Sequence, residues 1–332
     1  METQNLEIID QIIQRIDIGA DRRIFFNQQP SSYTPAQVQN ISVPMLVEAL
    51  QNLIYTEFYT KSTFQNSNYP TPEAVHQFSK KLRDVNTSKE RFDEGWTVIS
   101  VDYQGVILAQ KGSYKRHVQS GEYIGVSCFG RKPQQGDTLK LFVRKDYYEP
   151  EGGFYFVFGE HQAEQNLQQN VRFYFNIKAE GSTRLVEQIS TQLNLYQVPF
   201  QFKCLNHESL YQRADSAVLY LEKRYCSLTM RLLSAMIDTI KPYLKPDVPA
   251  FTLKLHDGIG FAENPLNPNE SFGTNLSKVI ANGIVSAVNQ RMPKNLWKQE
   301  ILKQIQLRHL NINQLYLNPN TQFPYQFSIP SK

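Results

Sequence analysis

The sequence contains few cysteines, three in 332 residues: Cys128, Cys204 and Cys226. They are far apart and form no C-x-x-C pair, so neither a disulfide framework nor a zinc knuckle is indicated. No apolar run approaches the roughly 20 residues that a membrane-spanning helix needs. The apolar pattern of residues 5–16 is interrupted by Glu7 and Asp10 and is followed by no small-residue cleavage site, which excludes a signal peptide. We therefore expect a cytoplasmic protein without a membrane partner.

Concentrated charge and the common catalytic motifs are also missing. Lys and Arg number 35 against 31 Asp and Glu, and the net charge of +4 is dispersed, whereas nucleic-acid binders usually show a basic run. The chain has no G-x-x-x-x-G-K-[ST], G-x-G-x-x-G or G-x-S-x-G sequence. Its six histidines are each more than forty residues from the next, so no helical zinc pair exists. We expect no nucleic-acid partner, no metal and no cofactor.

What is present suits a globular protein of two parts. Apolar residues make up 41% and aromatic residues 12% of the chain, and its length allows two domains. Residues 1–90 are predicted to be a helical N-terminal region, with a helical stripe over 43–59 and another helix that opens at Thr71 and Pro72. The polar stretch 86–95 is the expected linker. Residues 91–332 are predicted to form an α+β domain.

The α+β part is expected to begin as an antiparallel meander punctuated by glycines. Its predicted strands are 96–102, 106–111, 123–128, 138–145 and 154–158. An ordered series follows: strand 171–178, helix 182–195, strand 199–205, strand 215–221, helix 227–244 and strand 250–256. This order is typical of a split βαβ-βαβ sheet with its helices on one face and the opposite face left free. Two further helices are predicted over 274–289 and 295–306.

The stretch "VRFYFNIK", residues 171–178, predicts two chemically different faces for this sheet. Phe173, Phe175 and Ile177 alternate with polar residues, so the apolar set marks the buried side. The other side of three predicted strands holds four permanent cations and no carboxylate: Arg172, Tyr174, Asn176, Lys178, Gln201, Lys203, Thr252, Lys254 and His256. Neighbouring like charges are unfavourable without a counterion, so this cationic opposite face is a candidate anion site. A wet face, or one covered by acids of the N-terminal part, remains the alternative.

Arg213 and Asp215 stand just before Ala217, Leu219 and Leu221, which form one side of the predicted strand 215–221. Such a pair could orient Arg213 toward the cationic face, where the planar guanidinium would suit a phosphate or carboxylate. An ordinary surface ion pair is the equal alternative and would contribute little to stability.

Several blocks of sequence, in order, resemble the HopA effector family, which includes type III secretion effectors of plant pathogens and stand-alone bacterial proteins. The resemblance covers residues 92–283 and is most specific in its "PFQFK" and "R-x-D-x-A-V-L-Y" blocks and in the "PAFTLKL" block with its following "SFG". The blocks are "RFDEGW", "GGFYFVFGE", "VRFYFNIKAEG", "VPFQFKCLN", "YQRADSAVLYLEKR", "VPAFTLKLHDGIGFAENP" and "ESFGTN".

The resemblance implies a metal-independent lyase. Stand-alone HopA-like proteins of class V lanthipeptide pathways are implicated in removing phosphate from phosphoserine or phosphothreonine, which leaves dehydroalanine or dehydrobutyrine. A phosphorylated precursor peptide would then be the partner, and whether a separate kinase-like protein is also required stays open. The shared blocks imply that Arg172, Lys203, Arg213 and Lys254 lie in the functional site.

Our hypothesis for the chemistry is β-elimination. Lys203 is the expected base, because cationic neighbours favour the neutral amine that a base must present. Lys254 would neutralise the charge that grows on the leaving oxygen, although the two lysines could exchange roles. The expected phosphate-binding residues are Arg172, Arg213, Lys178, Tyr174 and Asn176. The alternative function is a non-catalytic, effector-like or peptide-binding module that uses the same cationic sheet face.

Overall fold

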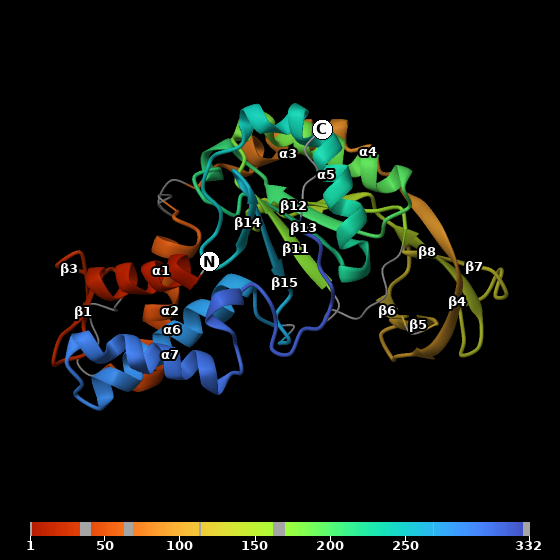
Figure 1. The fold of residues 1–332 in the computed structure, drawn as a ribbon. Coiled ribbons are helices and arrows are strands. Elements are labelled where there is room, and N and C mark those ends of the chain that lie inside the picture. Colours follow the sequence, from red (N-terminus) through yellow and green to blue (C-terminus); the bar gives the residue numbers. More distant parts are fainter. Residues whose placement is uncertain are drawn as a thin grey trace.

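The computed structural model describes residues 2–33, 41–62, 69–112, 114–161, 170–267 and 269–327. Within these ranges the chain is an α+β protein with seven α-helices and three antiparallel sheets. Figure 1 shows a helical part, a central sheet covered by further helices, and a second sheet beyond it. The α+β class predicted from the sequence is confirmed.

The helical part is built from both ends of the chain. Helix α6 packs against α2 and α7, and α7 also contacts α1. α2 begins at a Ser42 cap followed by Val43 and Pro44, and it ends in a π-helical segment, η1, which reaches the central sheet. The bounds are α1 Glu2–Arg15, α2 Val43–Ile54, η1 Tyr55–Tyr59, α6 Phe272–Asn289 and α7 Trp297–Leu307.

The first ninety residues are not purely helical, which corrects the prediction. A small antiparallel sheet follows α1, and α3 (Pro72–Val85) then opens at the predicted Thr71 cap. The small sheet comprises β1 Ile16–Ile18, β2 Ile24–Phe26 and β3 Gln29–Pro30. These strands are too short to leave an alternating pattern in the sequence.

The central sheet has seven strands in the order β14-β15-β11-β13-β12-β10-β9. Helices α3, α4 and α5 lie together on one side of it (Figure 1). β11 and β12 are both antiparallel to β13 and are joined by α4, which is a split βαβ unit. The bounds are β9 Asp146–Tyr148, β10 Phe154–Phe158, β11 Asn170–Phe175, α4 Ser182–Leu195, β12 Gln201–Leu205, β13 Ala217–Glu222, α5 Cys226–Ile240, β14 Leu253–His256 and β15 Ile259–Glu263.

The sheet beside β11 differs from the prediction. β15, which we did not predict, pairs with β11. The strand predicted over 250–256 is the shorter β14, which pairs with β15 at the edge of the sheet. Gly258 has a positive φ of 71° in the turn between them. Gly260 stands in the middle of β15 with Thr252 closely packed against it. Gly258 just before this strand and Gly260 within it masked the strand in the sequence.

The second large sheet has five strands in the order β6-β5-β4-β8-β7 and a small core of its own around Trp96, Leu139 and Leu141. β4 begins at Arg91, so the linker predicted over 86–95 is in part a strand. The predicted single meander is also wrong, because β10 joins the central sheet. The bounds are β4 Arg91–Val101, β5 Ile107–Lys111, β6 Tyr114–Val118, β7 Tyr123–Gly125 and β8 Thr138–Val143.

One continuous hydrophobic core joins the helical part to the central sheet. The predicted boundary between two domains at residues 90 and 91 stays a prediction. The three cysteines are free and buried. In the described ranges, no helix combines the length and the apolar character needed to cross a membrane.

Candidate functional site

Three of the predicted basic residues come together beside the central sheet. Arg172 is on β11, Lys203 on β12, and Arg213 in the loop that leads into β13. The Tyr220 ring lies between the first two, and the Phe154 ring lies between the last two. We call Arg172, Lys203 and Arg213 the basic cluster.

Arg172 carries a buried charge. The residue is only 8% exposed, and its guanidinium carbon lies 5.2 Å from the centroid of the Tyr220 ring. Its Nε donates a hydrogen bond to Oδ1 of Asn264 at 2.7 Å. Among the described residues, no carboxylate lies within ion-pair distance of it. A neutral amide and an aromatic ring are therefore its main partners.

Lys203 is partly exposed and rests on aromatic rings. Its Nζ lies 4.2 Å from the ring centroid of Phe154 and 5.8 Å from that of Tyr220. Such cation–π contacts stabilise the charge without neutralising it. The lysine can therefore meet a ligand from the open side of the sheet.

Arg213 is held by a buried carboxylate. Its Nε donates to Oδ1 of Asp215 at 2.5 Å, and its Nη2 donates to Oδ2 at 2.8 Å and to the Tyr55 hydroxyl at 3.0 Å. Asp215 is 6% exposed, so this is no ordinary surface pair. Burial alone would raise the pKa of Asp215, but Arg213 and then Lys203 outweigh it and hold the pKa below its usual value. The guanidinium is thereby fixed in one orientation.

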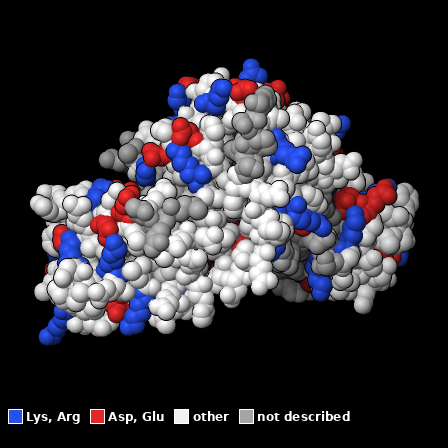
Figure 2. All heavy atoms as spheres, viewed as in Figure 1, with Lys and Arg blue, Asp and Glu red and all other residues white. Residues whose placement is uncertain are grey.

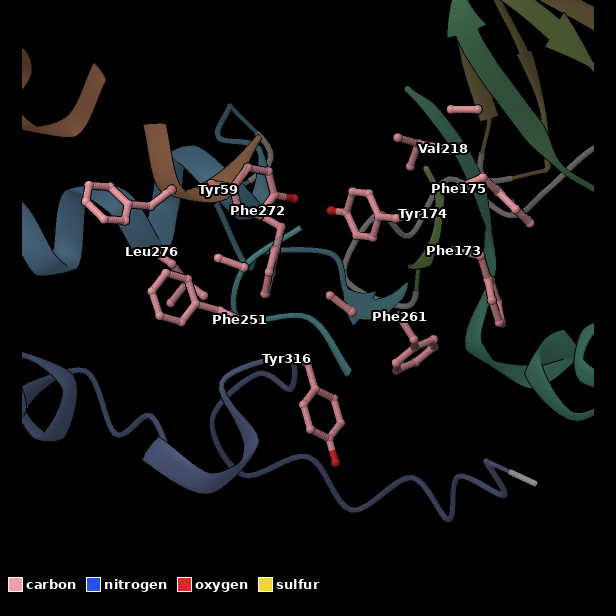
Figure 3. Packing of buried hydrophobic residues seen from close by; sticks show 14 of the residues in the cluster. Tyr59, Phe173, Tyr174, Phe175, Val218, Phe251, Phe261, Phe272, Leu276 and Tyr316 are labelled. Atoms are coloured by element: carbon pink, nitrogen blue, oxygen red, sulfur yellow. The ribbon is translucent and has the colours of Figure 1, made fainter. Parts of the chain in front are cut away.

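Three tyrosines close the other side of the cluster. Tyr55 stacks on Tyr59 with centroids 5.3 Å apart, and Tyr59 meets Tyr174 edge to face at 6.4 Å. Figure 3 shows the hydroxyls of Tyr59 and Tyr174 pointing toward one another, with Tyr174 directed away from Phe173 and Phe175. The Tyr174 hydroxyl is buried and, among the described residues, makes no hydrogen bond of ordinary geometry. Burial raises its pKa to about 12, although Arg172 opposes the shift.

The expected free face is therefore covered over β11. η1 and the start of α6 pack on it through Tyr59 and Phe272. Arg172, Tyr174 and Asn176 are all buried, which rules out a wet face at this strand. The covering residues that touch Tyr174 are aromatic rather than acidic.

Lys254 is not near the cluster, contrary to the expectation that it shares the functional site. The aligned positions run from Lys254 through Gly260, Tyr174 and Val218 to Lys203. Four strand intervals of about 4.8 Å put the Cα atoms of Lys254 and Lys203 roughly 19 Å apart. Lys254 instead pairs with Asp257 at 2.6 Å. It lines a separate cavity of about 500 Å³ between α1, η1 and the segment before β14.

Asn176 and Lys178 also lie apart from the cluster. Asn176 donates through Nδ2 to the Asp247 carbonyl at 3.0 Å. Lys178 is 4.0 Å from Glu180 and about half exposed. Six residues along an extended chain separate it from Arg172 by roughly 20 Å. Of the predicted phosphate-binding residues, Arg172, Arg213 and Tyr174 are thus brought together.

The aromatic and amide partners of the cluster were not predicted from the sequence; they are Tyr55, Tyr59, Phe154, Tyr220 and Asn264. One signal was available: Tyr55 and Tyr59 are four residues apart and therefore share one side of a helix. No local signal could relate Asn264 to Arg172, because they are 92 residues apart.

The visible surface shows no single basic field. In Figure 2, Lys and Arg atoms are scattered and interspersed with Asp and Glu on the face shown. The arginines of the basic cluster are mostly buried, so its charge acts locally.

The family model described as the HopA1 effector protein family matches residues 147–317, which include β10 to α7 and the whole basic cluster. This match covers more than half of the chain, and the protein belongs to the HopA1 effector protein family. No curated protein sequence matches the chain.

Two solved structures are similar over nearly their whole length. An effector protein from Pseudomonas syringae pv. tomato strain DC3000 aligns with a TM-score of 0.52 and 13% identity, covering 96% of this chain and 99% of that one. An effector protein from Pseudomonas syringae pv. syringae strain 61 aligns with a TM-score of 0.49 and 12% identity, with the same coverage. At such low identity the first similarity shows a shared fold and nothing finer.

Proposed function

We propose that this protein is a lyase that removes phosphate by β-elimination from phosphoserine or phosphothreonine in a peptide. The observation that carries the proposal is Arg172, a buried guanidinium with no carboxylate partner among the described residues. An uncompensated buried charge costs several kcal/mol. A phosphate ester bound beside it would supply the missing counterion.

The two arginines and Tyr174 provide the phosphate site. Arg172 and Arg213 would hold the phosphate oxygens, and the Tyr174 hydroxyl, which makes no hydrogen bond of ordinary geometry among the described residues, would donate a further hydrogen bond. Because the pKa of Tyr174 is about 12, this hydroxyl stays protonated at neutral pH and remains a donor. Donors that are fixed before the substrate arrives stabilise the charge that builds on the leaving phosphate.

Lys203 is the proposed base. The arginines of the cluster cannot be deprotonated in a protein, and Tyr174 holds its proton too firmly to act as the base. Lys203 would take the Cα proton, the electron pair of that bond would form the Cα–Cβ double bond, and the Cβ–O bond would break. Inorganic phosphate leaves with the electron pair, and the proton on Lys203 passes to solvent. The product residue is dehydroalanine or dehydrobutyrine, and the step requires no oxidant or reductant.

The proposed substrate is a phosphorylated precursor peptide of the lanthipeptide type. Lys254 has no part in the step, because its distance from Lys203 keeps it from the same phosphate.

A non-catalytic peptide-binding module is the second candidate. The observation that favours it is the seat of Lys203 on the Phe154 ring, since cation–π contact stabilises the charged amine rather than the neutral base. Such a module would dock a phosphorylated peptide without changing it.

Product mass separates the candidates. The purified protein is incubated with a phosphothreonine peptide and with its unphosphorylated twin, and both are analysed by mass spectrometry. Elimination removes phosphoric acid and leaves a dehydrobutyrine that adds a thiol. A phosphatase would leave the threonine hydroxyl, and a binding module would leave the phosphopeptide unchanged, so either result would contradict the lyase.

A further inference from the structure

A second basic pocket lies where the five-stranded sheet meets the edge of the central sheet. It has a volume of about 450 Å³, within the range of ligand sites. The ends of β4 and β8, together with β6, supply three arginines, and one carboxylate, Glu122, is present. The charged and titratable lining residues are Arg91, Arg116, Arg144, Glu122, Tyr147 and His161. We call this the arginine pocket.

The positive charges of the arginines in this pocket are only weakly neutralised by carboxylates. Arg144 is 3.9 Å from Glu122, the limit of an ion pair, and Arg91 and Arg116 have no ion pair among the described residues. Nη1 of Arg91 is shielded from solvent and has no hydrogen-bond partner in the part of the chain that the structure describes. Three guanidinium groups against one carboxylate leave the pocket with an excess of positive charge that favours an anion.

The pocket is continuous with the basic cluster along one sheet face. Tyr147 lines the pocket and packs on Phe156 at 6.4 Å, and Phe156 packs on Phe154 at the same distance. The Phe154 ring in turn makes a cation–π contact with the Lys203 ammonium group. Phe156 stands opposite both Tyr147 and Lys203 in the strand register, so these three side chains share a face.

This part of the face is open, unlike the part over β11. Phe154, Phe156 and Lys203 are partly exposed, and Gln201 beside them is exposed. The arginine pocket and the basic cluster are separated by two to three strand intervals, which is a distance of roughly 10–14 Å. An extended peptide covers that distance in about three to four residues.

We propose that the arginine pocket is a specificity subsite for a carboxylate or second phosphate in the substrate peptide, about three to four residues from the residue that loses phosphate. This inference rests on the proposed function. The aromatic rings between the two sites form the floor on which the intervening residues lie.

Kinetics on matched peptides test the subsite. Phosphothreonine peptides carry either Glu or Gln at the fourth position before the phosphothreonine, and a second pair varies the fourth position after it. For one of the two pairs, the Glu peptide should have a KM about tenfold lower, the effect of one charge-assisted hydrogen bond. Arg116→Gln should bring the ratio of kcat/KM between Glu and Gln peptides close to one.

Lys115→Gln is the matched control. Lys115 precedes Arg116 on β6, is exposed and points to the other side, and its substitution removes the same charge. It should keep the preference for Glu. Equal kinetics of Glu and Gln peptides with the unaltered protein would overturn the subsite while leaving the lyase intact.

If no peptide undergoes elimination, the lyase fails and the subsite is tested by binding. Fluorescence anisotropy with the same labelled peptides should then show the Glu preference and its loss in Arg116→Gln. Absence of that preference would overturn the subsite as well.

Discussion

At the scale of single residues, the site depends on charges held in fixed positions. Asp215 fixes Arg213 through two hydrogen bonds, and both side chains are largely withdrawn from water. Arg172 is fixed instead by a neutral amide, which leaves its charge available. One arginine of the cluster is thus compensated internally, and the other is left to a ligand.

Replacing Asp215 by Asn should destabilise the fold, because it leaves Arg213 buried without a counterion. Breaking such a pair costs about 3 kcal/mol or more in the free energy of unfolding. Chemical denaturation measures this. Asp10→Asn is the control, since its pair with Lys298 is exposed and contributes little. Equal stability of both variants would show that the buried pair is not needed.

The Asp215 carboxyl makes the stability of the fold depend on pH. The pKa of Asp215 is lowered in the folded state, below the unfolded value of about 3.9. Its contribution to stability is therefore complete above that value and is lost as pH falls through the lower folded pKa. The stability difference between the unaltered protein and Asp215→Asn should shrink below about pH 4.

At the scale of elements, the junction of η1, α6 and β11 determines the geometry of the covered face. Gly273, in the first turn of α6, allows Tyr59 to approach: an added Cβ would lie 2.3 Å from its ring. Tyr59 in turn meets Tyr174. Helix packing thereby sets the position of a hydroxyl in the site.

Gly273→Ala should destabilise the protein by about 1–3 kcal/mol, as expected for overpacking. Thermal or chemical denaturation measures the loss. Asn282→Ala, at a partly exposed position in the same helix, should change stability by less than about 0.5 kcal/mol. An unchanged stability of Gly273→Ala would contradict the close contact.

The elements that the sequence predicted well carry strong local patterns. α4 was predicted over 182–195 and β10 over 154–158, as observed, because their apolar spacing and flanking turn residues are clear. β15 was missed because Gly258 and Gly260 read as a turn, and the error misplaced Lys254 as a neighbour of β11. Alternation correctly put Arg172 and Lys203 on one face, but it could not reveal the cover of η1 and α6, which comes from distant segments.

At the scale of the whole molecule, the described chain has two separate hydrophobic cores. The larger joins the helices to the central sheet, and the smaller lies within β4 to β8. The basic cluster lies in the part of the chain built around the larger core. The arginine pocket lies where this part meets the five-stranded sheet. The five-stranded sheet should therefore be able to open without loss of the basic cluster.

Leu139→Ala tests this independence. Leu139 is fully buried in the smaller core, and its truncation should cost about 2–5 kcal/mol there. Hydrogen exchange should accelerate in β4 to β8 and stay slow in β11 to β13. Leu219→Ala, in the larger core, should accelerate exchange in β11 to β13. Uniform acceleration by Leu139→Ala would show that the two cores unfold as one.

The most direct test of the proposed chemistry compares two lysine substitutions on the same sheet. The rate of dehydrobutyrine formation from a phosphothreonine peptide is measured for the unaltered protein, Lys203→Ala and Lys254→Ala, each checked for folding by circular dichroism. We predict that Lys203→Ala slows elimination by about 10² to 10⁴, the usual contribution of a general base, and that Lys254→Ala stays within about threefold of the unaltered protein. Rapid elimination by Lys203→Ala, or equal loss in both variants, would contradict the account.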